Sequence, residues 1–133
     1  MDNYLKLNGK YLEEAQALLS KGDYVQASEK FWGAAAEIVK AVAANRGMKL
    51  KSHGELHGFV TRLKKELGAP ELTRLFGTAA TLHQNFYENW LPPETVIDYG
   101  EAVKELVDKL SRYTNNLNKI RNHAKVHSAE TIS

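Results

Sequence analysis

The sequence predicts an all-α protein, a five-helix antiparallel bundle with a long C-terminal helix. Apolar residues recur at steps of three and four along most of the chain, which is the period of an amphipathic helix. No segment shows the strict alternation of apolar and polar residues that is typical of a strand. Breaks that contain Gly or Pro divide the chain into five segments. A length of 133 residues fits one domain, which we place at 1–133, with a bundle core over about 4–111 and a basic C-terminal extension over 112–133.

The first two helices are predicted on either side of the turn Lys21-Gly22-Asp23. Gly22 supplies the C-terminal stop of the first helix, and Asp23 is the predicted N-cap of the second, which ends at Asn45-Arg46-Gly47. The apolar face of the first helix consists of Leu5, Leu12, Ala15 and Leu19. The apolar face of the second consists of Ala27, Phe31, Ala35, Ile38 and Val42.

The third and fourth helices are separated by Gly68 and Pro70. Ser52 is the predicted N-cap of the third helix, and Glu55, three residues later, completes a capping box. Pro70 suits the first turn of the fourth helix, which the segment Leu91-Pro92-Pro93 interrupts. The apolar face of the third helix consists of Leu56, Phe59, Val60, Leu63 and Leu67. The fourth carries Leu72, Leu75, Phe76, Ala79, Leu82 and Phe86, and its face could extend to Trp90.

The fifth helix has the most regular pattern of the five. Its apolar residues alternate in steps of three and four, which makes a heptad seam of Val96, Tyr99, Val103, Leu106, Leu110, Tyr113, Leu117, Ile120 and Ala124. A continuous helix over 94–125 would be roughly 50 Å long, whereas the other helices would measure about 25–35 Å. One end should therefore extend beyond the bundle and need a partner, which predicts a homodimer. Asn115 and Asn116 leave open a break into two helices.

The net charge of +2 hides an uneven distribution. Residues 46–65 carry six Lys and Arg and one acidic residue. Residues 66–108 carry two Lys and Arg and eight acidic residues, so this middle segment is acidic. Residues 109–133 are basic again, with five Lys and Arg and one acidic residue. This alternation indicates either contact with nucleic-acid phosphates or pairing of the two kinds of surface, within the fold or across a dimer. The absence of Cys excludes disulfides, thiolate metal sites and a Cys nucleophile. No apolar run reaches the ~20 residues of a membrane span and no signal peptide is evident, so we expect a cytoplasmic protein without membrane contact.

Five histidines are the main candidates for chemistry. His53 and His57, like His123 and His127, lie four residues apart, which places both imidazoles of a pair on one helix face, as a metal site requires. No third ligand is fixed by the sequence, so we predict neither a metal nor a cofactor. His83 lies within the apolar face of the fourth helix, where a core histidine bonded to a neighbour is expected.

The segment 82–90 is dense in aromatic and polar residues, which favours either closure of the bundle end or a pocket. On the second helix, Trp32 widens the apolar face, and Glu37 is spaced to pair with Lys40. The pocket candidates are His53, His57, His83, Asn85, Tyr87 and Trp32. A small-ligand or metal pocket bounded by the first three is one interpretation.

Arg121 and His127 are the candidate catalytic residues. A guanidinium can hold a phosphate, and an imidazole can transfer a proton near neutral pH. No companion acid lies beside them in the sequence.

Three segments, 11–15, 22–35 and 82–88, together resemble the archaeal PaREP family of small helical proteins, which is placed in or near the HEPN superfamily. The resemblance covers roughly residues 4–111. It implies a helical bundle, commonly dimeric, of a class found in RNA-processing, toxin–antitoxin and defence systems, often beside nucleotidyltransferases. Active HEPN members are metal-independent endoribonucleases with an Arg, four to six residues and a His. The corresponding region here, 83–87, has no preceding Arg, and Arg121 and His127 fit the formula only beyond the resembling region.

The sequence therefore favours a non-catalytic, HEPN-like helical module that dimerises and binds a partner. The resemblance to HEPN proteins implies that this partner is a protein of the nucleotidyltransferase type or a nucleic acid such as RNA, within a toxin–antitoxin or defence-type system. The alternative is a metal-independent HEPN endoribonuclease that uses Arg121 and His127.

Overall fold

The computed structural model describes the backbone of residues 2–132 and the side chains of residues 3–116. The described chain forms five helices and no strand, which confirms the predicted fold class. In chain order they are α1 (Asp2–Ser20), α2 (Tyr24–Ala44), α3 (His53–Leu67), α4 (Glu71–Glu88) and α5 (Pro93–Ile132). No helix of the described part is long and apolar enough to cross a membrane.

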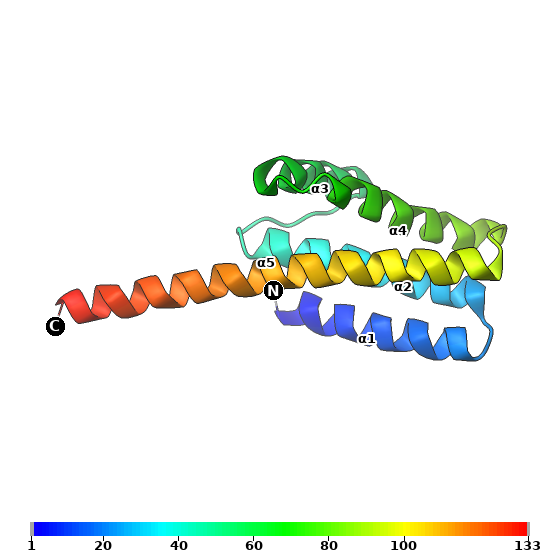
Figure 1. Cartoon of the computed structure of the whole chain (residues 1–133), viewed down its shortest axis with the longest axis horizontal. Helices are drawn as coiled ribbons and strands as arrows, with labels where there is room; N and C mark the ends of the chain where they lie inside the picture. The colour runs from blue at the N-terminus through cyan, green and yellow to red at the C-terminus, as the bar shows by residue number, and fades with distance from the viewer. Residues whose placement is uncertain (1, 133) are drawn as a thin grey trace.

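α2 lies at the centre of the bundle, in contact with each of the other four helices (Figure 1). Most of its length is buried, and many of the buried residues are alanines, namely Ala27, Ala34, Ala35, Ala36, Ala41 and Ala43. Small side chains allow neighbouring helices to approach on several sides, while Phe31 and Ile38 fill the remaining core volume. This enclosure explains why the apolar face of α2 is wider than the single stripe that its sequence predicts.

The caps that the sequence predicts form as expected. Asp23 accepts a hydrogen bond from the Gln26 backbone N–H at 3.1 Å, and Ser52 accepts one from the Glu55 N–H at 3.1 Å. The Glu55 carboxylate, in turn, accepts from the Lys51 N–H, one residue before the N-cap. These bonds satisfy backbone groups that the first helical turn leaves unpaired, and so they fix where α2 and α3 begin.

Two glycines allow close contact between α2 and its neighbours. A Cβ on Gly100 of α5 would lie 2.7 Å from ring atoms of Phe31, and one on Gly33 of α2 would lie 2.9 Å from the Tyr11 ring of α1. Both distances are too short for a carbon–carbon contact. The two glycines thus set how close α5 and α1 come to α2.

Arg46, at the C-terminal end of α2, connects three elements. Its guanidinium lies 2.6 Å from the Glu66 carboxylate of α3 and donates to the Tyr113 hydroxyl of α5 at 2.8 Å. The guanidinium also lies over the Phe59 ring, 5.5 Å from its centroid. This residue, which the sequence places in a basic segment, therefore serves the fold.

α5 is one continuous helix of 40 residues, and no break occurs at Asn115 and Asn116. By length it is about 60 Å, against about 32 Å for the 21 residues of α2. Its second half extends beyond the bundle (Figure 1), which confirms the predicted overhang. The seam residues Val96, Val103, Leu106 and Leu110 are buried in the bundle. The seam residues from Leu117 onward lie outside the part whose side chains are described.

Two sequence predictions for α3 and α4 need correction. α4 ends at Glu88, because Asn89 adopts a left-handed conformation (φ 48°), so Trp90 lies outside the helix and is 48% exposed. Leu67, assigned to the apolar face of α3, is exposed because it sits at the end of the helix, next to the Gly68 stop.

Gly100→Ala is expected to destabilise the fold. The added methyl group would meet the fully buried Phe31 ring, which cannot move without displacing its own neighbours. We expect a loss of about 1–3 kcal/mol in the free energy of unfolding, measured by denaturant titration. The control is Gly58→Ala on exposed α3 surface, where nothing lies within 4 Å and helix propensity favours Ala by up to about 1 kcal/mol. Equal effects at the two sites would refute the close approach.

Glu66→Gln is expected to remove a pH-dependent contribution to stability. The hydrogen bond from Arg46 holds the pKa of Glu66 below its ordinary value of 4.5. The carboxylate is stabilised only in the folded state, so the contribution is present above about pH 4.5 and is lost as the pH falls through the lower folded pKa. The gap in melting temperature between wild type and Glu66→Gln should therefore narrow as the pH falls from about 5 through the lower folded pKa of Glu66. A gap independent of pH would contradict this assignment.

Candidate functional site

Four rings from three helices meet on one side of the bundle. We call Trp32 of α2, His53 of α3, and His83 and Tyr87 of α4 the imidazole–aromatic cluster. The His83 ring stacks on the Trp32 indole with a centroid distance of 5.2 Å. His53 meets both rings edge-on, at 5.2 Å from Trp32 and 5.1 Å from His83, and Tyr87 lies edge-on to His83 at 5.3 Å. Four of the six predicted pocket residues are thus adjacent.

His83 is bonded to a carboxylate that the sequence does not associate with it. Its Nδ1 lies 3.0 and 3.1 Å from the two oxygens of Glu29 on α2. A carboxylate only accepts, so this hydrogen bond is donated by a proton on Nδ1 of His83. The predicted hydrogen bond to a neighbour is present, but His83 is a half-buried residue at the margin of the bundle, with 23% of its side chain exposed.

His57 lies apart from the cluster although it shares a helix face with His53. Its ring packs edge-on against Phe76 of α4, at a centroid distance of 4.7 Å, and its side chain is exposed. Within the described side chains, no three His, Asp or Glu residues are placed to hold a metal ion. The two histidines therefore cover neighbouring aromatic residues, one over Trp32 and the other over Phe76.

Asn85 is buried and does not line a pocket. Only 1% of its surface is exposed. Its Oδ1 accepts hydrogen bonds from the backbone N–H groups of Trp90 and Leu91, both at 2.8 Å, and its Nδ2 donates to the Ser28 hydroxyl of α2 at 3.0 Å. The side chain therefore joins α4, α2 and the connection that leads into α5.

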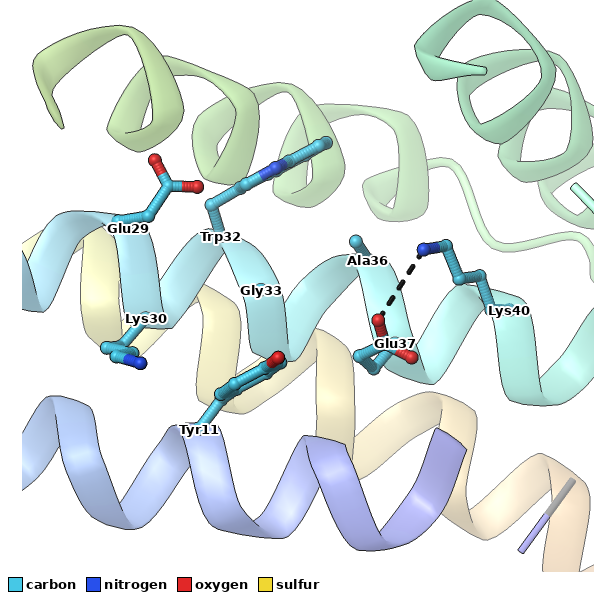
Figure 2. A pocket seen from close by; sticks show the side chains of 8 residues that line it. All are labelled: Tyr11, Glu29, Lys30, Trp32, Gly33, Ala36, Glu37 and Lys40. Atoms are coloured by element: carbon cyan, nitrogen blue, oxygen red, sulfur yellow. Dashed lines mark hydrogen bonds and ion pairs between the residues drawn. The ribbon is translucent and has the colours of Figure 1, made fainter. Parts of the chain in front are cut away.

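A cavity of about 230 Å³ opens beside the cluster, along the face of α2 next to α1. We call it the α2 groove (Figure 2). It is lined by Tyr11, Glu29, Lys30, Trp32, Gly33, Ala36, Glu37 and Lys40. It shares Trp32 with the cluster and contains Glu29, the partner of His83. The predicted Lys40–Glu37 pair lies at its other end, at 3.5 Å. Apart from Tyr11, the lining residues recur at steps of one to three on α2. This pattern could have identified the face, but not the cavity.

The catalytic candidates Arg121 and His127 lie outside the residues whose side chains the structure describes. Their backbone belongs to the second half of α5. In the described part, Arg46 is the arginine that reaches across the bundle, and it binds Glu66 and Tyr113 at the opposite end of α2 from Glu29.

The comparisons with known proteins agree with this fold. Residues 3–107 match the sequence model of the Archaeal PaREP1/PaREP8 family. The chain belongs to this family. The crystal structure of a protein from Sulfolobus solfataricus is similar to this chain, with 31% identity, a TM-score of 0.71, and coverage of 80% of this chain and 94% of that one. A comparison with curated proteins finds no match.

The predicted PaREP membership is therefore confirmed, over nearly the expected residues. The region matched to the PaREP1/PaREP8 family contains the whole imidazole–aromatic cluster and the α2 groove. It ends before Arg121 and His127. This member of the PaREP1/PaREP8 family therefore matches the family model over the bundle. The second half of α5 lies outside the matched region.

Asn85→Ala is expected to destabilise this PaREP1/PaREP8 protein by about 2–4 kcal/mol. The variant removes the acceptor of the partly buried N–H groups of Trp90 and Leu91, and it removes the buried donor to the Ser28 hydroxyl. Gln84→Ala, which removes a neighbouring exposed carboxamide, is the matched control and should change stability by less than about 0.5 kcal/mol. Thermal and denaturant unfolding measure both. A mild Asn85→Ala would mean that the carboxamide is not a structural link.

Proposed function

We propose that this chain is a non-catalytic, HEPN-like helical module of the cytoplasm that forms a homodimer through the second half of α5 and binds a partner. The observation that carries this proposal is the length of α5. Its 40 residues are about twice the 21 residues of α2, so its second half passes beyond the helices that could cover it (Figure 1). An element that leaves its own bundle is suited to contact another molecule.

The seam of α5 supports a second copy as the contact. In the bundle, the aliphatic seam residues Val96, Val103, Leu106 and Leu110 are buried, and α5 packs against α2 and α4. The same spacing continues in the sequence through Leu117, Ile120 and Ala124. A heptad seam buries its apolar positions against an equivalent seam, and most soluble homo-oligomers are two-fold symmetric. Two copies can therefore satisfy each other through the same segment.

The charge of the chain supports nucleic acid as one class of partner. Residues 109–133 carry five Lys and Arg and one acidic residue, so a dimer joined here would concentrate positive charge. Binding, rather than cleavage, is favoured at the region that corresponds to the HEPN motif, because no Arg stands before His83 at the spacing of that motif. A protein partner of the nucleotidyltransferase type would meet the same half of α5.

Ile120→Glu is expected to convert the dimer to a monomer, because a carboxylate at a seam position would have to be buried against the partner helix. Light scattering should give twice the 14.9 kDa chain mass for the wild type and a single chain for the variant. Asn118→Glu makes the same change in charge off the seam and should remain dimeric. A wild type that stays at 14.9 kDa at micromolar concentrations would refute the homodimer.

A further inference from the structure

The α2 groove has one polar group whose hydrogen-bonding capacity is not used. Glu37 is only 9% exposed. Its Oε1 lies 3.5 Å from the Lys40 ammonium, a long contact, while its Oε2 is buried without any hydrogen-bond partner among the described side chains. A buried carboxylate oxygen without a donor is costly, so this oxygen fits a donor supplied from the groove.

The other charged groups of the groove already have partners. The Lys30 ammonium lies 2.8 Å from Glu14 and 5.2 Å from the centroid of the Tyr11 ring. The hydrogen bond from Lys30 also lowers the pKa of Glu14. Glu29 is held by His83 at 3.0 Å. The loosely closed pair of Glu37 and Lys40 is therefore the part of the lining that an incoming ligand can open.

The rest of the lining is apolar and narrow. Figure 2 shows Tyr11 of α1 beneath Gly33, and Trp32 on the opposite side of α2. Gly33 has no side chain and Ala36 has only a methyl group, so these two residues leave space on the surface of α2 for a ligand. A volume of about 230 Å³ is below the ≈ 300–1,000 Å³ of sites for drug-sized ligands, so the occupant must be small.

We propose that the α2 groove binds a small zwitterion of the amino-acid class. Its ammonium group donates to Glu37, its carboxylate accepts from Lys40, and its side chain lies against Trp32 and Tyr11. Such a ligand would separate Glu37 from Lys40, and its own ammonium and carboxylate would replace the charge that each of the two side chains loses. A ligand with only one charge would leave either the Glu37 carboxylate or the Lys40 ammonium without a counter-charge in a largely buried place. The assignment does not rest on the proposed homodimer, because the groove lies within the bundle.

The test uses the full chain labelled with ¹⁵N and the protein amino acids added one at a time. Each is added at about 10 mM, since a ligand of so few atoms is expected to bind with a Kd in the millimolar to micromolar range. We expect at least one amino acid to give saturable shifts of the backbone amides of Gly33, Ala36, Glu37 and Lys40. The amine that lacks its carboxylate and the acid that lacks its ammonium should each bind about tenfold more weakly.

Two variants and one control locate the binding. Glu37→Gln and Lys40→Met should each weaken the binding about tenfold, while Glu13→Gln, on the exposed surface of α1, should leave it unchanged. Lys40 is a partly exposed side chain, so Lys40→Met tests the site even where Glu37→Gln does not fold. The proposal is overturned if no amino acid shifts these amides, as when Glu37 holds only an ordered water. It is also overturned if neither variant weakens binding, or if the amine alone binds as tightly as the zwitterion.

Discussion

The enclosure of α2 is the constraint on which the rest of the structure depends. Four helices pack around it, and each contact needs a side chain on α2 that fits the neighbour on that side. Alanines allow close approach, and Phe31 reaches α5 only because Gly100 has no side chain there. All four of the other helices thus take part of their position from α2, while α4 and α5 also pack directly against each other.

The same constraint explains where the candidate site lies. A helix with four neighbours keeps only a narrow face open, and on α2 that face carries Glu29, Gly33, Glu37 and Lys40. The polar residues of α2 gather there because its other sides are packed against neighbours. The imidazole–aromatic cluster forms at the edge of this open face. There the Trp32 ring, at the margin of the core, contacts the first turn of α3 and the last turns of α4. Core packing and the site therefore share side chains.

Local signals in the sequence predict the elements well and the site only in part. Helix ends follow from short-range chemistry, such as Asp23 with the N–H of Gln26, and so they can be read from neighbouring residues. The proximity of His83 to Glu29, 54 residues earlier, depends on how α4 crosses α2, and no periodicity encodes that crossing. Asn85 shows the same limit, because its type suggested a pocket, whereas the fold buries it as a link between α4 and α2. The charge of segment 46–65 was also ambiguous, and Arg46 proved to bind Glu66 within the fold.

The continuity of α5 has a consequence for orientation. Each residue of an α-helix turns the chain by about 100°, so an unbroken helix fixes the angular phase of its far end relative to its near end. The near end is held against Phe31 through Gly100, so the bundle sets the direction in which each position of the far end faces. A molecule that binds the far end of α5 is therefore held at one fixed rotation about the helix axis relative to the bundle. Adding or deleting a single residue near Asn115 would change that rotation by more than a quarter turn, with the core unchanged.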